Sequence, residues 1–182
     1  MMSCEPWQCA EIAATKKANP ITKPEVAVGL IKRAARPILV VGSNATERSM
    51  EGKLLIDYII DFAKASNVQI VATAHMVGEF LKRGYTPAGF MSAMDIGNRL
   101  VDPTWQGLDG KGHPDLAIFV ALPYYMEALI LSGLKHFAPD LRTMTIDNLY
   151  HPHASWSYPN GGLEDWANNL KVMTSKFEGG QQ

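Results

Sequence analysis

Short apolar runs alternate along the chain with longer segments whose apolar residues recur at helical spacing. The clearest runs are residues 38–41 (Ile-Leu-Val-Val) and 116–122 (Leu-Ala-Ile-Phe-Val-Ala-Leu), which are apolar on both faces, as a buried parallel strand requires. Pro37 can only start a strand, because it lacks the N–H that a strand ladder uses. Leu55, Tyr58 and Phe62 show the other pattern, with spacings of three and four that indicate an amphipathic helix.

Read in this way, the whole chain predicts an alternation of strands and helices. The predicted helices cover residues 24–35, 51–66, 76–82, 93–100, 123–137 and 163–177, and the predicted strands cover residues 38–41, 68–73, 89–91, 116–122 and 143–146. Asn67 and Gly84 are placed to end two of the helices in the left-handed conformation. Alternating strands and helices favour right-handed crossovers and a parallel sheet covered on both faces. We therefore predict a three-layer α/β/α, doubly wound, Rossmann-like domain over residues 24–182, preceded by an N-terminal arm over residues 1–23.

Composition and charge narrow the class of protein. A chain of 182 residues with 47% hydrophobic residues can bury one substantial core. The formal net charge is −1 and the basic residues are scattered, which disfavours nucleic acid and an anionic membrane as partners. No apolar run reaches the roughly 18 residues of a membrane span, and the N-terminus lacks a secretory pattern, so we expect a cytoplasmic protein.

A parallel sheet of this type places its ligand crevice at the carboxyl ends of the strands. Residues 42–44 (Gly-Ser-Asn) end the first predicted strand, where backbone N–H groups and a hydroxyl could hold a phosphate at a helix start. The next glycine is Gly52, so the G-x-G-x-x-G pattern is missing, and a strand-to-helix turn without a ligand is an equal alternative. Tyr124 could stack on a flavin or adenine ring or simply pack. The candidate cofactor-binding residues are Gly42, Ser43, Asn44, Thr73, His75 and Tyr124, and Asp147 leaves another strand end nearby.

Catalytic and metal signatures are missing from the sequence. It contains no G-x-S-x-G, G-x-x-x-x-G-K-[ST], H-E-x-x-H or C-x-x-C, and His75 has no cysteine or carboxylate beside it, so we predict no catalytic residue. Residues 151–153 (His-Pro-His) have metal-binding side chains, but the proline favours an extended segment with divergent side chains. We predict a variable surface loop there and no metal site. Cys4 and Cys9 are too few for a disulfide framework or an iron–sulfur site, and a reduced pair is expected.

Two tryptophans stand in polar loops rich in Pro and Gly. Trp105 and Trp156 must either fold back over the core or contact another chain. The loop that contains Trp105 reads Leu-Val-Asp-Pro-Thr-Trp-Gln-Gly-Leu-Asp-Gly-Lys-Gly over residues 100–112, directly before the buried run at 116–122.

That loop, the arm Pro-Trp-Gln-Cys-Ala-Glu-Ile over residues 6–12 and the strand Arg-Pro-Ile-Leu-Val-Val-Gly over residues 36–42 resemble the epsilon subunit of the archaeal acetyl-CoA decarbonylase/synthase complex. The resemblance covers nearly the whole chain. It implies a Rossmann-like fold of the deoxyhypusine-synthase-like NAD/FAD-binding type. The strand and turn alone also resemble the central domain of thiamine-diphosphate enzymes, but the chain lacks room for the flanking catalytic domains.

The resemblance also implies partners. Family members pair with the large alpha subunit of carbon monoxide dehydrogenase, two of each chain, and that subunit holds the nickel and iron–sulfur clusters. The small subunit is expected either to stabilise the large one or to help electrons reach FAD, so FAD is the possible cofactor. A homodimer would fit the stoichiometry. The expected partner-binding residues are Trp7, Trp105, Asp109 and Lys111.

Overall fold

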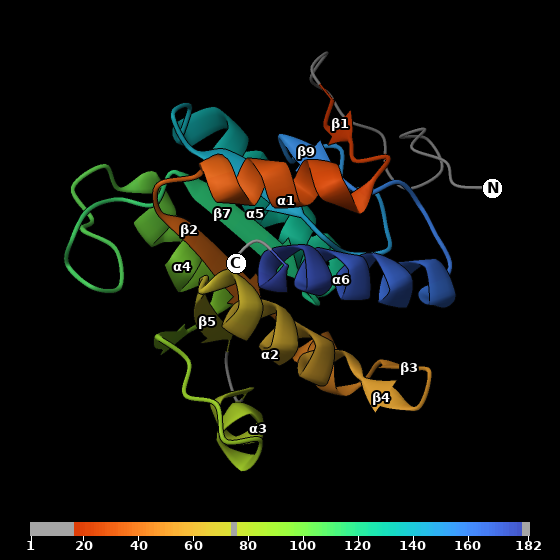
Figure 1. Ribbon diagram of the computed structural model, residues 1–182. Helices are drawn as coiled ribbons and strands as arrows, with labels where there is room; N and C mark the ends of the chain where they lie inside the picture. Colours follow the sequence, from red (N-terminus) through yellow and green to blue (C-terminus); the bar gives the residue numbers. More distant parts are fainter. Residues whose placement is uncertain (1–16, 74–75, 180–182) are drawn as a thin grey trace.

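A computed structural model describes residues 17–73 and 76–179 of the chain. Within these residues, seven parallel strands form one sheet, in the order β1-β9-β8-β7-β2-β5-β6 (Figure 1). The strands are β1 (Asn19–Pro20), β2 (Pro37–Val41), β5 (Gln69–Thr73), β6 (Gly89–Met91), β7 (Leu116–Val120), β8 (Arg142–Thr145) and β9 (Trp156–Ser157). The predicted parallel α/β fold is confirmed.

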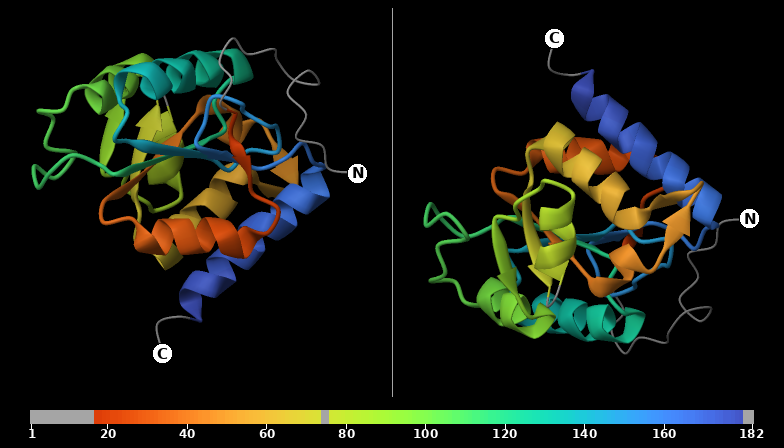
Figure 2. Two further views of the ribbon diagram at one scale, coloured as in Figure 1. Left: turned by 90° about the horizontal axis from the view of Figure 1, so that it is seen from above. Right: turned by 90° about the horizontal axis from the view of Figure 1, so that it is seen from below.

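Helices cover both faces of the sheet (Figure 2). One face carries α1 (Pro24–Arg33), α2 (Leu55–Ser66) and α6 (Leu163–Glu178), which share one apolar core with the sheet. The other face carries α4 (Ala93–Val101) and α5 (Tyr124–Phe137), which bury a second core. The short helix α3 (Val77–Lys82) joins β5 to β6. None of the helices in these ranges is long and apolar enough to cross a membrane.

The two unbroken apolar runs lie side by side at the centre of the sheet. Strand β2 pairs with β7 from Pro37 opposite Leu116 to Val41 opposite Val120. From β2 the chain crosses to β5 on one side, whereas β7 is followed by β8 on the other side. The carboxyl ends of β2 and β7 therefore mark the point where the strand order reverses, which is where a ligand crevice is expected in this fold.

The segment after β2 differs from the prediction. In place of a helix from residue 51, the chain forms the 3₁₀-helix η2 (Ser43–Thr46) and then a hairpin of β3 (Ser49–Met50) and β4 (Lys53–Leu54), and α2 begins only at Leu55. Glu51 and Gly52 have φ of 50° and 76°, as a tight hairpin turn with two left-handed residues requires. Gly52 is thus a turn glycine, which the apolar periodicity around it conceals.

The sheet also extends into the predicted N-terminal arm. Strand β1 pairs with β9, and the side chains of Ala18 and Ile21 are buried in the cores. The described part of the arm, residues 17–23, therefore belongs to one edge of the domain. Strands β1 and β9 are two residues long, too short to show a period of two. Trp156 lies in β9 and packs against the core, which is the first of the two alternatives for this residue.

Candidate functional site

The crevice at the strand ends begins with Gly42, which touches the backbone after β7. Its N–H donates to Val120 O at 2.9 Å. A Cβ atom built on Gly42 would lie 2.3 Å from Ala121 O and 2.5 Å from two backbone atoms of Leu122. Gly42 is therefore a site where two backbones come too close for a side chain.

The donors after Gly42 are used inside the protein as well. Asn44 donates its N–H to Ala121 O at 3.0 Å and its side-chain amide to Leu122 O at 3.3 Å. Ser43 accepts a hydrogen bond at its carbonyl from Thr46 Oγ1. The helix that begins at Ser43 is one 3₁₀ turn of four residues. The backbone N–H groups of Gly42 and Asn44, which a phosphate would need as hydrogen-bond donors, instead hold the turn to the end of β7.

The other cofactor candidates have protein partners too. Thr73 is buried and its hydroxyl donates to Val41 O at 2.9 Å, so it links β5 to β2. The ring of Tyr124 stacks on the imidazole of His151, with centroids 4.3 Å apart and planes 26° from parallel. His75 lies outside the described residues. Of these candidates, Asn44 and Tyr124 line one small cavity at the strand ends.

The crevice is almost filled by these contacts. The cavity between Asn44, Tyr124, Asp147 and His151 has a volume of about 20 Å³. Such a volume holds roughly one water-sized species, whereas pockets for cofactors measure about 300 Å³ or more. In this conformation, the described residues leave space for a small ligand but not for a flavin ring.

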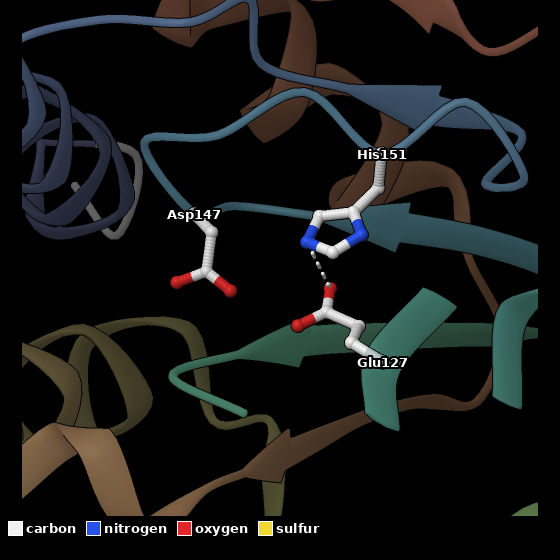
Figure 3. A group of neighbouring side chains, drawn as sticks. All are labelled: Glu127, Asp147 and His151. Atoms are coloured by element: carbon white, nitrogen blue, oxygen red, sulfur yellow. Dashed lines mark ion pairs between the residues drawn. The ribbon is translucent and has the colours of Figure 1, made fainter. Parts of the chain in front are cut away.

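Three titratable side chains come together beside this cavity: Glu127, Asp147 and His151 (Figure 3). Glu127 is on α5, Asp147 directly follows β8, and His151 is on the loop between β8 and β9. All three are buried. Because α5 leads from β7 to β8, the start of the helix and the residues that leave β8 lie at the same edge of the sheet.

Asp147 is the fixed member of this cluster. Its carboxylate accepts the N–H of Ala121 at 3.0 and 3.1 Å through its two oxygens. Ala121 itself has φ of 61°, which ends β7 two residues before the predicted limit. The conformation turns this N–H out of the strand ladder and toward Asp147.

Burial controls the charge of the cluster. It raises the pKa of the Glu127 carboxyl well above its usual value, and the charge of Asp147 adds to the rise. Burial also raises the pKa of Asp147 to about 6 and lowers the pKa of the His151 imidazole to about 4. At neutral pH His151 is therefore neutral. Its contact with Glu127, 3.7 Å from Nε2 to Oε1, is not a charged pair and is too long for a hydrogen bond.

The prediction of a surface loop at residues 151–153 is wrong. Only 2% of His151 is exposed, and Pro152 is buried as well. The segment is held inward because His151 N donates to Ser157 Oγ and Pro152 O accepts from Ala18 N. These partners come from β9 and from the residue before β1, and the periodicity missed both of these short strands.

Sequence reasoning also missed Glu127. The sequence did contain an indication, because Glu127 precedes the buried residues of α5 by three, four and seven positions and so lies on the same stripe of the helix. These residues are Ile130, Leu131 and Leu134. A carboxylate on the apolar stripe of a helix is a reason to look for a partner.

The loop between α4 and β7 forms a second candidate site, at the opposite ends of the strands. Arg36 fixes it: the guanidinium donates to Gly112 O at 2.9 Å and pairs with the carboxylate of Asp109. Asp109 also accepts the N–H of Lys111 at 3.1 Å. Asp109 thus anchors the loop through these two contacts, although both Asp109 and Lys111 are exposed.

Trp105 lies in the same loop but is only partly exposed. Its ring packs against the core under α4 and α5 and meets His113 edge-on, with centroids 6.2 Å apart. Next to it is a mainly apolar groove of about 560 Å³. The groove is lined by the ends of α4 and α5 and by the segments before β7 and β8, including Leu100, Val101, Pro103, Pro114, Phe137 and Leu141.

We expect Asp109→Ala to loosen this loop. The substitution removes the carboxylate that holds Arg36 and the N–H of Lys111 together. Limited trypsin digestion should then cut after Lys111 several-fold faster than in the wild type, since cleavage follows local opening. Asp140→Ala, at an exposed aspartate beside the groove, is the matched control and should leave the rate unchanged. Equal digestion of Asp109→Ala and wild type would contradict the anchoring role.

Comparison with known proteins gives one consistent result. Residues 1–174 match the family model described as CO dehydrogenase beta subunit/acetyl-CoA synthase epsilon subunit. The chain is 36% identical over 172 residues to the acetyl-CoA decarbonylase/synthase complex subunit epsilon of Methanothermobacter thermautotrophicus, covering 92% of this chain and 93% of the relative. It is 36% identical over 156 residues to subunit epsilon 1 of Archaeoglobus fulgidus and 33% identical over 156 residues to the subunit epsilon of Methanothrix soehngenii, each covering 85% of this chain and 80% of the relative.

Proposed function

Because the chain belongs to the family of CO dehydrogenase beta subunits and acetyl-CoA synthase epsilon subunits, we propose that it acts as an accessory epsilon subunit in the cytoplasm. In this role it pairs with the large alpha subunit of carbon monoxide dehydrogenase, two of each chain, and stabilises that subunit. The observation that carries the proposal is the family match over residues 1–174, supported by relatives named as epsilon subunits of the acetyl-CoA decarbonylase/synthase complex.

The residues of the chain favour an accessory role over an active one. Nickel and iron–sulfur clusters are held mainly by cysteine thiolates, and the whole sequence has only Cys4 and Cys9. The metal clusters of CO oxidation therefore belong to the large partner in this proposal, and the chain alone has no activity.

The apolar groove beside Trp105 is the proposed docking surface for the large subunit. Phe137, at its edge, is 71% exposed, and such a large exposed ring is a typical centre of a protein interface. Lys111 adds a positive charge on the adjoining loop. Trp105 lies half-buried behind the groove, where its ring packs against His113, one of the lining residues. Asp109 acts indirectly, because its carboxylate holds the loop in place.

Association and stabilisation are tested together with the purified chain and the purified large subunit. Analytical ultracentrifugation should show a complex of two large and two small chains. The half-life of CO oxidation at raised temperature should be several-fold longer in the complex than for the large subunit alone. No association, or association with an unchanged half-life, would contradict the proposal.

The same complex tests the alternative, an FAD-binding or FAD-directed electron-transfer module. Such a module would need the crevice at residues 42–44 to open, because the cavity there is about 20 Å³. Calorimetric titration with FAD, with and without the large subunit, separates the two roles. Saturable binding that requires this chain would favour electron transfer.

A further inference from the structure

The carboxylate of Glu127 is the least satisfied polar group in the described part of the protein. Its side chain is 0% exposed, and its polar neighbours are the Asp147 carboxyl and the Thr145 hydroxyl, but neither oxygen makes a hydrogen bond of good geometry with the described residues. The Nδ1 atom of His151 lacks one as well. A buried carboxyl group without hydrogen bonds costs a protein several kcal/mol of desolvation, and proteins rarely keep such a group without a ligand.

The carboxyl group of Glu127 faces Asp147 and the Nε2 atom of His151. One ligand atom from each of Glu127, Asp147 and His151 lies within 4.8 Å of the other two (Figure 3). The distance from Glu127 Oε1 to His151 Nε2 is 3.7 Å. Two ligands bound about 2.1 Å from one metal ion are separated by at most about 4.2 Å. The spacing of Glu127 and His151 already falls within this limit.

The surroundings favour a small cation. Asp147 is fixed by the N–H of Ala121, in the way that outer hydrogen bonds orient metal ligands. The cavity beside Asp147 and His151, about 20 Å³, suits a single ion or water molecule. Arg48 also lines this cavity, but its guanidinium donates to Asn148 and lies over the ring of Trp166, so it does not satisfy Glu127.

We propose that Glu127, Asp147 and His151 bind one divalent first-row transition cation, for which Zn²⁺ is the probe. A neutral imidazole with two carboxylates is a ligand set typical of such ions, whereas Mg²⁺ and Ca²⁺ prefer oxygen ligands alone. The ion joins α5, the end of β8 and the β8–β9 loop, and so it stabilises the strand-end crevice. This inference is independent of the proposed function.

The test is a calorimetric titration of the metal-free full chain with Zn²⁺. It uses a Cys4→Ser/Cys9→Ser background, which removes the two thiolates as competing ligands. We expect one Zn²⁺ per chain and a melting temperature raised by roughly 5 to 10 °C at a hundredfold excess over the dissociation constant. X-ray absorption at the zinc edge should show nitrogen and oxygen ligands only.

Single substitutions assign the ligands. Glu127→Gln and His151→Gln preserve size and should each weaken Zn²⁺ binding at least tenfold, with circular dichroism unchanged. His136→Gln, at an exposed histidine near the end of α5, is the matched control and should bind like the parent. If either ligand variant does not fold, the number of Zn²⁺ ions bound per parent chain and the zinc-edge spectrum of the parent still test the proposal.

Two outcomes would overturn the proposal. One is the absence of Zn²⁺ binding in the parent. The other is binding that persists in both Glu127→Gln and His151→Gln.

Discussion

Replacing Gly42 with alanine is expected to lower the free energy of unfolding by about 3 kcal/mol or more. The new Cβ would lie 2.3 Å from Ala121 O and 2.5 Å from Leu122 N, both backbone atoms. Strands β2 and β7 cannot easily move apart, because β2 is also paired with β5 and β7 with β8. Urea denaturation followed by circular dichroism measures the change.

Gly133→Ala is the matched control. Gly133 lies in α5, and a Cβ there meets nothing within 4 Å. Alanine is favoured over glycine inside a helix, so this variant should gain about 0.5 to 1 kcal/mol. A loss below about 1 kcal/mol in Gly42→Ala would contradict the packing explanation. It would favour the alternative in which the glycine exists to admit a phosphate.

The central sheet was predictable because its strand sequences are compatible with few folds. Strands β2 and β7 are apolar on both faces, and only a sheet covered by helices on both sides can bury such strands. The short strand Gly89–Met91 and the left-handed Asn67 after α2 were also predicted, since turn residues delimit them. Local sequence was sufficient wherever a segment is long enough for its period to show.

The candidate cluster was not predictable in the same way, because it depends on long-range packing. Glu127, Asp147 and His151 come from three separate segments, and His151 is buried through bonds to β9 and to the residues beside β1. Strands β1 and β9 have two residues each, and they pair with each other across more than 130 positions of the sequence. The hairpin after η2 was missed for a related reason, since a turn at Glu51 and Gly52 interrupts what reads as helical spacing.

Substituting Phe137 with aspartate is expected to weaken association with the large subunit at least about 30-fold, the effect of losing a central interface residue. The ring is 71% exposed in the isolated chain, so its loss removes little from the fold. In the proposed complex, the aspartate would place an unpaired charge in an apolar groove. Trp105→Ala should also weaken binding, but its ring packs on the core, so that variant tests folding and docking together.

Leu163→Asp provides the matched control for Phe137→Asp. Leu163 is exposed too, but it begins α6, on the opposite face of the sheet (Figure 2). Calorimetric titration of each variant with the large subunit should give wild-type affinity for Leu163→Asp and the large loss only for Phe137→Asp. Equal losses would mean that charge on any apolar surface position disturbs the complex. If only Leu163→Asp lowered the affinity, the large subunit would lie over α6, because a new charge weakens binding where it is buried in the interface.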